Sequence, residues 1–276
     1  MSATPHVWLF DLDNTLHDAD PHIFPHIHRL MTEYLCKHLQ VDDDTATALR
    51  QRYWAHYGTT LTGMMRHHGT DPHHFLHHTH QIPDLEHKVI AERGLEAMLQ
   101  RLPGKKIIFS NAPSQYIEAV MAVAGIARCF DTIYSIERLR FEPKPAIGGF
   151  IRLLRNEELN PKSCIMVEDT LPNLKTAKRL GMRTVWVSAC TRRPPYVDVT
   201  LPSVMRLPQT QQLRGEKKSV SISEDVLLHV IVNVHATADD VHAESSGHGK
   251  ADKLAVAFIV IGAFNGARSE EHTSEL

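Results

Sequence analysis

The sequence predicts an α/β protein in which a parallel β-sheet with flanking helices is interrupted once by an inserted all-helical module. Short apolar runs alternate with helices of about ten residues between residues 106 and 187, which is typical of strand–helix–strand units in a parallel sheet. A buried strand also opens the chain at residues 7–10. Between these two regions the chain shows helical periodicity and no strand-like run.

The predicted elements of the core follow in a regular order after the insertion. Strands are expected at residues 106–110, 132–135, 164–167 and 184–187. Helices are expected between them at residues 114–124, 146–155 and 171–180. Gly125 and Gly181 end the first and the last of these helices, because glycine readily adopts the left-handed conformation that terminates a helix.

The inserted module is predicted to contain only helices, at residues 22–39, 45–56, 60–67, 72–80 and 85–101. Its composition is also distinct, since 15 of the 20 histidines fall between His6 and His87. We therefore place the core at residues 1–16 and 102–213, and the helical module at residues 17–101.

Composition and charge narrow the classes of partner. The formal net charge of −2 over 276 residues gives no reason to expect that the protein binds a nucleic acid or a membrane surface. No segment approaches the ~20 apolar residues of a transmembrane helix, and no secretory signal is visible. The four cysteines lie far apart, without metal or redox spacing. We therefore expect a cytoplasmic protein.

The most informative local pattern is an apolar strand that ends in two carboxylates. Asp11 and Asp13 follow residues 7–10, and Asn14 and Thr15 form a turn after them. Residues i and i+2 of an extended chain project to the same side. Both carboxylates should therefore lie at the carboxyl end of a buried strand, where open α/β sheets bind ligands. Taken alone, the pattern also fits a strand that runs into an ordinary polar turn.

Later segments add groups suited to phosphate chemistry at corresponding positions. They are Ser110 with Asn111 after the next strand, Lys144 between two prolines, and the pair Glu168 and Asp169 after a later strand. The carboxyl ends of parallel strands share one edge of a sheet, so these groups are expected to converge with the opening carboxylates.

Such a convergence predicts a phosphatase mechanism. A carboxylate nucleophile divides hydrolysis of a phosphomonoester into two steps through an aspartyl-phosphate. Attack of one anion on another requires positive charge nearby, which Lys144 and a Mg²⁺ held by oxygen ligands would supply. The second carboxylate can protonate the leaving alkoxide and later deprotonate water.

Four short motifs resemble those of the haloacid dehalogenase-like hydrolase superfamily, and they occur in the same order. The motifs are FDLDNT at 10–15, FSN at 109–111, KP at 144–145 and VEDT at 167–170. The resemblance implies a Rossmann-like core, and the inserted helices resemble the C1-type cap of the superfamily.

The resemblance also implies a role for each motif residue. Asp11 would be the nucleophile and Asp13 the acid/base. Mg²⁺ would be bound by Asp11, the main-chain carbonyl of Asp13 and Asp169, with Glu168 assisting. Lys144 would orient Asp11 and hold the phosphoryl group. Substrate or phosphate contacts are further expected from Ser110, Asn111, Asn14 and Thr15. A true dehalogenase is disfavoured, because halide departs without a proton and needs neither an acid at position 13 nor a cation.

The inserted module resembles that of the pyrimidine 5′-nucleotidase branch, through YGTT at 57–60 and RHHG at 66–69. This resemblance implies hydrolysis of UMP- or CMP-like nucleotides, with Tyr57, His67 and His68 contacting the substrate. Two alternatives stay open: a phosphatase for another small phosphomonoester, such as a sugar phosphate or phosphoglycolate, and a non-catalytic binding module. Histidine pairs four residues apart, at 73/77 and 74/78, could bind Zn²⁺, although a solvated helix face is the default.

The last part of the chain, residues 214–276, is atypical. Its end, RSEEHTSEL at 268–276, resembles a translated sequencing-library adapter. We therefore predict that this tail is partly an assembly artefact, and we attach no function to it. An intact reading frame through Leu276 in genomic DNA would refute this interpretation.

Overall fold

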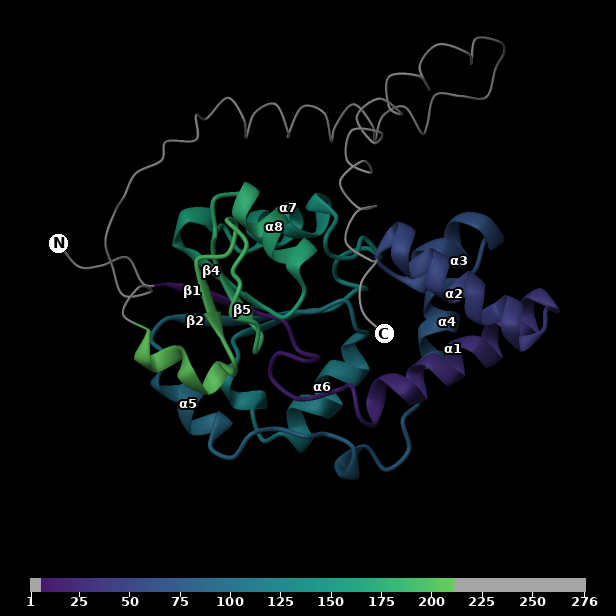
Figure 1. The fold of residues 1–276 in the computed structure, drawn as a ribbon, viewed down its shortest axis with the longest axis horizontal. Helices are drawn as coiled ribbons and strands as arrows, with labels where there is room; N and C mark the ends of the chain where they lie inside the picture. Colours follow the sequence, from purple (N-terminus) through teal and green to yellow (C-terminus); the bar gives the residue numbers. More distant parts are fainter. Residues whose placement is uncertain (1–5, 211–276) are drawn as a thin grey trace, which may run out of the picture. The chain divides into compact units, whose positions relative to one another are not determined.

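The computed structural model describes residues 6–210, so the predicted tail lies outside the described residues. Its parallel strands form one sheet in the order β3-β2-β1-β4-β5-β6. Figure 1 labels β1, β2, β4 and β5 of this sheet. The strands are β1 Val7–Phe10, β2 Lys105–Phe109, β3 Thr132–Tyr134, β4 Cys164–Glu168, β5 Arg183–Val187 and β6 Val199–Leu201. This is the parallel α/β sheet that the alternating pattern predicts, and it is Rossmann-like, as the resemblance implies.

The central strand β1 contributes to two hydrophobic clusters. Trp8 and Phe10 belong to one cluster, whereas Val7 and Leu9 belong to the other, because successive side chains of a strand point to opposite faces of the sheet. The first cluster includes residues of α5 (Leu95–Arg101) and α6 (Ser114–Val123). The second includes residues of α7 (Ile147–Asn156) and α8 (Leu171–Arg179). All of β1 is buried, as expected for a strand covered on both faces.

The insertion between β1 and β2 is helical, as the sequence predicts. It comprises α1 (Ile23–Leu39), α2 (Asp43–Tyr57), α3 (Thr60–His68) and α4 (Pro72–Thr79). These helices share a third hydrophobic cluster, which includes Tyr34, Leu35, Tyr53, Met64 and Phe75. Within the described part of the chain, no helix is both long and apolar enough to cross a lipid bilayer.

Two elements differ from the prediction. Residues 85–101 are not one helix: a 3-10 turn at Leu85–His87 is separated from α5, which begins after Gly94. Between them, Ile90 O accepts a hydrogen bond from the Asp18 N–H at 2.8 Å, and this tertiary contact overrides the helical periodicity. The edge strand β6 is not predicted from the sequence, because so short a run shows no clear alternation.

The position of β1 determines where polar side chains can gather. It pairs with β2 on one side and with β4 on the other, with Phe10 opposite both Ile108 and Val167. Since all three strands run in the same direction, the residues that follow them lie at one edge of the sheet.

Gly63 of α3 allows a close contact within the inserted helices. A Cβ at this position would lie 2.1 Å from Cγ of Tyr53. We predict that Gly63→Ala lowers the free energy of unfolding by at least about 1 kcal/mol, because overpacking outweighs the roughly 1 kcal/mol gained in helix propensity. Urea denaturation followed by circular dichroism measures the change. Gln51→Ala, at an exposed position of α2, is the control and should change the free energy of unfolding by no more than about 0.5 kcal/mol. An equally small change for Gly63→Ala would contradict the close contact with Tyr53.

Candidate active site

The carboxyl end of β1 carries a cluster of three carboxylates. Asp11 follows β1 directly, and its N–H donates to Val167 O of β4 at 3.0 Å, so this residue is still held in the sheet. Glu168 and Asp169 reach the same place from the end of β4. One side-chain oxygen of each of the three residues lies within 4.8 Å of the other two. The structure therefore brings together carboxylates that lie far apart in the sequence.

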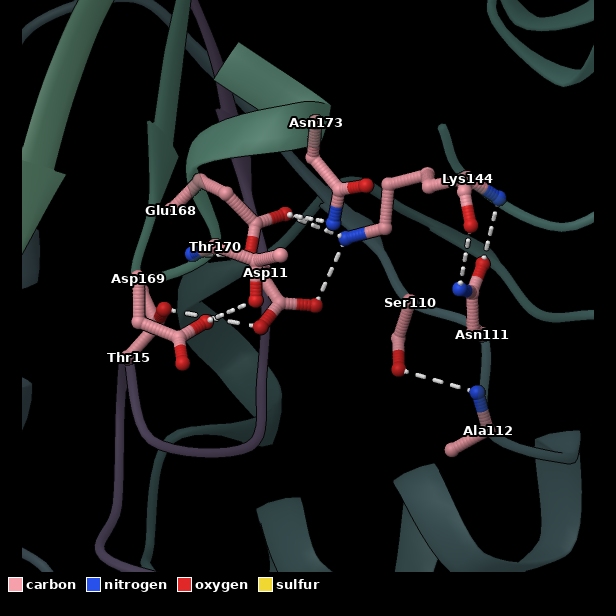
Figure 2. Close-up of polar contacts among 10 residues, drawn as sticks. All are labelled: Asp11, Thr15, Ser110, Asn111, Ala112, Lys144, Glu168, Asp169, Thr170 and Asn173. Atoms are coloured by element: carbon pink, nitrogen blue, oxygen red, sulfur yellow. Dashed lines mark hydrogen bonds and ion pairs between the residues drawn. The ribbon is translucent and has the colours of Figure 1, made fainter. Parts of the chain in front are cut away.

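A buried lysine lies between two of these carboxylates (Figure 2). Lys144 Nζ donates to Asp11 Oδ1 and to Glu168 Oε2, each at 2.7 Å. The side chain of Asn111 holds the backbone of Lys144: Nδ2 donates to the Lys144 carbonyl at 3.0 Å, and Oδ1 accepts from its N–H at 2.8 Å. The side chain of Asn111, predicted to contact substrate, thus positions the lysine.

Glu168 is bound by donors from three directions. Besides Lys144, the Asn173 side chain donates to Oε2 at 3.0 Å, and the Thr170 N–H donates to Oε1 at 3.2 Å. Glu168 is only 1% exposed, and both of its oxygens accept hydrogen bonds. It therefore serves as a counter-charge that keeps the Lys144 ammonium beside Asp11.

Burial controls the protonation of this cluster. Burial and the neighbouring Glu168 raise the pKa of Asp11 to about 7, although Lys144 opposes the rise. Burial likewise raises the pKa of Glu168 to about 7, against the effect of Lys144, and it raises the pKa of Asp169. Burial disfavours the Lys144 ammonium, but the two carboxylates outweigh this effect and hold its pKa above the ordinary value. One ammonium thus faces three carboxyl groups.

Asp13 has a separate set of partners. Its Oδ1 accepts a hydrogen bond from Tyr116 OH at 2.5 Å and lies 2.9 Å from His17 Nε2. Burial and the Asp13 charge raise the pKa of Tyr116, so the phenol remains a donor. His80, which follows α4, packs edge-on against Tyr116 with ring centroids 6.0 Å apart. Burial lowers the pKa of His80 to about 4, so this imidazole is neutral near pH 7.

The remaining core residues predicted to contact phosphate have different surroundings. Ser110 Oγ accepts a backbone hydrogen bond from Ala112 at 3.1 Å, which leaves its hydroxyl hydrogen available. Thr15 Oγ1 donates to Asp11 Oδ2 at 3.4 Å. The side chain of Asn14 instead bonds the loop at residues 19–20, with two contacts of 2.9 Å, and its φ is 59°. Asn14 therefore shapes the loop in this structure.

The predicted substrate residues Tyr57, His67 and His68 belong to two tyrosine–histidine pairs, of which the second also includes Tyr53. Tyr57 OH lies 2.7 Å from His67 Nε2, and Tyr53 OH lies 2.7 Å from His68 Nε2. Tyr53 is buried among the inserted helices. Gly58 approaches the lysine turn so closely that a Cβ on it would lie 3.2 Å from the Lys144 carbonyl. The end of α2 is therefore next to the buried lysine.

The carboxylate cluster is also the place where a metal ion could be held. Among residues 6–210, Asp11, Glu168 and Asp169 are the only group of three or more potential ligands whose atoms converge within 4.8 Å. The histidine pairs at 73/77 and 74/78 have no converging third ligand in that part of the chain.

Three site residues are missing from the predicted set. Asn173 lies five residues after Glu168, to which it donates, and His17 lies four residues after Asp13. Both separations are short enough to be found in the sequence. Tyr116 lies 103 residues from Asp13, so no local pattern could connect the two.

Comparison with known proteins identifies the family. The profile described as haloacid dehalogenase-like hydrolase matches residues 8–187, well over half of the chain. Among solved structures, the chain is similar to a HAD phosphatase from Thermococcus onnurineus, with a TM-score of 0.54 and 18% identity, covering 74% of this chain and 96% of that one. It is also similar to a haloacid dehalogenase-like hydrolase from Bacteroides fragilis (TM-score 0.53, 18% identity, 74% and 100% covered).

A third similar structure is an L-2-haloacid dehalogenase from Xanthobacter autotrophicus, with a TM-score of 0.50 and 15% identity, covering 78% of this chain and 100% of that one. At such identities a structural likeness shows the fold alone, whereas the profile match shows the family. The chain belongs to the haloacid dehalogenase-like hydrolase family and is a hydrolase.

Proposed function

We propose that the protein is a Mg²⁺-dependent phosphomonoesterase that acts through an aspartyl-phosphate on Asp11. One observation carries the proposal: Lys144 binds the Asp11 carboxylate at 2.7 Å, at the edge of a cluster with Glu168 and Asp169. This arrangement supplies a nucleophile, an ammonium beside it and a set of oxygen ligands.

We also propose a cytoplasmic location. All four cysteines are free: Cys36, Cys129, Cys164 and Cys190. Free thiols fit a reducing compartment such as the cytoplasm.

The donor set fits a hard divalent cation. All three clustered side chains offer carboxylate oxygens, which Mg²⁺ prefers. Burial, followed by the Glu168 charge, raises the pKa of Asp11 despite Lys144, so a bound cation would favour the ionised carboxylate. Asp11 and Asp169 would hold the ion, with Glu168 and the main-chain carbonyl of Asp13 assisting. When bound, Mg²⁺ would reduce the repulsion between the nucleophile and the phosphoryl group.

The residues of the chain then divide the reaction between them. An oxygen of Asp11 attacks phosphorus, while Lys144 and the Ser110 hydroxyl hold the phosphoryl oxygens. Asp13 gives a proton to the leaving alkoxide in the first step. In the second step it removes a proton from the water that hydrolyses the aspartyl-phosphate.

Asp13 favours a phosphatase over a dehalogenase, although dehalogenases are among the similar structures. Halide departs as a stable anion, so its displacement needs no proton donor. Here a second carboxyl group is present and is held by hydrogen bonds from Tyr116 and His17. An alkoxide leaving group, by contrast, needs a proton, which the carboxyl group of Asp13 can donate.

The proposed substrate is a pyrimidine nucleoside monophosphate of the UMP or CMP type. Tyr57 supports this, because it is hydrogen-bonded to His67 and directly precedes Gly58, which lies against the lysine turn, and aromatic rings can stack on a base. The inserted helices, with predicted boundaries at residues 17–101, would act as a cap. The alternative substrate is a more compact phosphomonoester, such as a sugar phosphate or phosphoglycolate.

Removal of the nucleophile should abolish turnover. We predict that Asp11→Asn lowers kcat for any accepted phosphomonoester by more than about 1,000-fold, because no aspartyl-phosphate can form. Release of inorganic phosphate in the presence of Mg²⁺ measures kcat. Asp44→Asn, an exposed position on α2, is the matched control and should retain full activity. Equal activity of Asp11→Asn and the wild type would exclude Asp11 as the nucleophile.

Mg²⁺ should stabilise the protein more at high pH than at low pH. In the metal-free folded state Asp11 and Glu168 keep their protons up to pH about 7, whereas in the unfolded chain they lose them near pH 4. The free energy of unfolding therefore falls as pH rises through this window, and Mg²⁺ must compete with the same protons.

We accordingly expect Mg²⁺ to raise Tm clearly at about pH 8 and very little at about pH 5. Differential scanning fluorimetry with Mg²⁺ or with EDTA provides the measurement. Asp169→Asn should lose the Mg²⁺-dependent shift, whereas Asp44→Asn should keep it. A shift of the same size at both pH values would be inconsistent with binding at this cluster.

A panel of phosphomonoesters distinguishes the two substrate classes. If the nucleotide proposal is correct, kcat/KM for UMP and CMP should exceed that for phosphoglycolate and sugar phosphates by at least about 10-fold, because base contacts add binding energy. Tyr57→Leu should reduce this preference and leave hydrolysis of the smaller esters nearly unchanged. Equal or slower turnover of UMP and CMP would favour the compact metabolite.

A further inference from the structure

Both described partners of Asp13 bind the same carboxylate oxygen. Tyr116 OH lies 2.5 Å from Oδ1, and His17 Nε2 lies 2.9 Å from the same atom. Tyr116 and His17 are each only 4% exposed. Among residues 6–210, no hydrogen bond is made to the other oxygen, Oδ2. The two ends of this carboxyl group therefore have different environments.

The tautomer of His17 follows from its surroundings. Its Nδ1 is buried and has no hydrogen-bond partner within the described residues. A buried N–H without an acceptor is costly, whereas Asp13 Oδ1 can accept a hydrogen bond from Nε2–H. Neutral His17 therefore carries its proton on Nε2 and acts as a second donor to Oδ1.

These two donors come from different parts of the chain. His17 returns to Asp13 through a tight turn, in which the Leu16 N–H donates to Leu12 O at 2.9 Å. Tyr116 comes from the first turn of α6, and its ring belongs to the hydrophobic cluster on one face of the sheet. Asp13 is thus tied both to its own loop and to the core.

We propose that Tyr116 and His17 are positioning residues, which occupy Oδ1 of Asp13 and leave Oδ2 to exchange the proton with the leaving group. An oxygen that accepts two hydrogen bonds has both lone-pair directions in use, so rotation of the carboxyl group would break both bonds. The proposal rests on the proposed phosphatase function, because it assigns a task to the acid/base of that reaction.

The chemical step shows why this orientation matters. A bond forms between an Asp11 oxygen and phosphorus, while the bond from phosphorus to the leaving oxygen breaks and its electron pair stays on that oxygen. The leaving oxygen takes the proton from Asp13 Oδ2. An alkoxide needs this proton in the transition state, whereas p-nitrophenolate is stable as an anion and leaves without it.

A purely structural role for the two hydrogen bonds leads to a different outcome. If they only fasten the loop to α6, their loss would lower stability and slow both kinds of substrate alike. If they position Asp13, their loss slows the release of alkoxide and spares p-nitrophenolate. The dependence on the leaving group therefore separates the two roles.

The test uses Tyr116→Phe in the full-length, Mg²⁺-loaded enzyme. Rapid-quench measurements follow leaving-group release in the first turnover, with p-nitrophenyl phosphate and with the alkyl phosphomonoester that the wild type hydrolyses fastest. We expect alkoxide release to fall roughly 10- to 100-fold, with p-nitrophenolate release within about two-fold of the wild type and KM little changed. His17→Leu should act in the same direction. His17→Gln keeps an N–H donor and should recover part of the lost rate.

Tyr134→Phe is the matched control. Tyr134 is also a buried tyrosine, and its OH donates to the Glu157 carboxylate at 2.9 Å, away from Asp13. Tyr134→Phe should leave the rate of leaving-group release unchanged for both substrates. Equal slowing of both substrates, or no slowing of either, by Tyr116→Phe and His17→Leu would overturn the positioning role. If Tyr116→Phe does not fold, the His17 pair decides the question alone.

Failure of the proposed function would look different. A wild type that hydrolyses no phosphomonoester, or an Asp13→Asn variant that slows both substrates equally in the first turnover, would contradict the acid/base assignment itself. If Asp13→Asn shows the dependence on the leaving group and the Tyr116 and His17 variants do not, only the positioning role is wrong.

Discussion

The ammonium of Lys144, buried between the carboxylates of Asp11 and Glu168, is the interaction on which the rest of the site depends. Three carboxyl groups at one edge of a sheet would repel one another if all were ionised, and burial adds a desolvation cost of several kcal/mol for each unpaired charge. Lys144 offsets part of this charge. The surroundings hold it in place, through Asn111 on its backbone and through Asn173 on its counter-charge Glu168.

The sheet and the inserted helices contact this site from different directions. Strands β1 and β4 are parallel neighbours, so Asp11 after β1 and the pair Glu168 and Asp169 at the end of β4 lie at the same edge of the sheet. The inserted helices meet the site at two places: Gly58, at the end of α2, lies against the lysine turn, and His80, after α4, packs on Tyr116. A shift of these helices would therefore change contacts both near the proposed nucleophile Asp11 and near the proposed acid/base Asp13.

Sequence patterns were sufficient where the physical cause is local. Apolar runs and helix-ending glycines predicted the alternating strands and helices of the core. The positions of Asp11 and Asp169 after strands, and of Lys144 ahead of a helix, predicted that these residues converge. They were insufficient where distant contacts compete with local preference. Residues 85–101 have helical periodicity, yet the bond between Ile90 and Asp18 holds part of that stretch out of a helix.

The sequence by itself determined the family, the α/β fold with its helical insertion, and the set of polar residues that meet at one sheet edge. The fold and the shared sheet edge follow from periodicity and from the common direction of parallel strands, and the family follows from four short motifs that occur in its order. Only the tertiary structure decided what each side chain binds: Asn111 holds the lysine backbone, Asn14 holds its own loop, and Tyr116 donates to Asp13 across 103 residues. Such partners depend on how helices pack against the sheet, and packing brings together residues whose separation carries no sequence pattern.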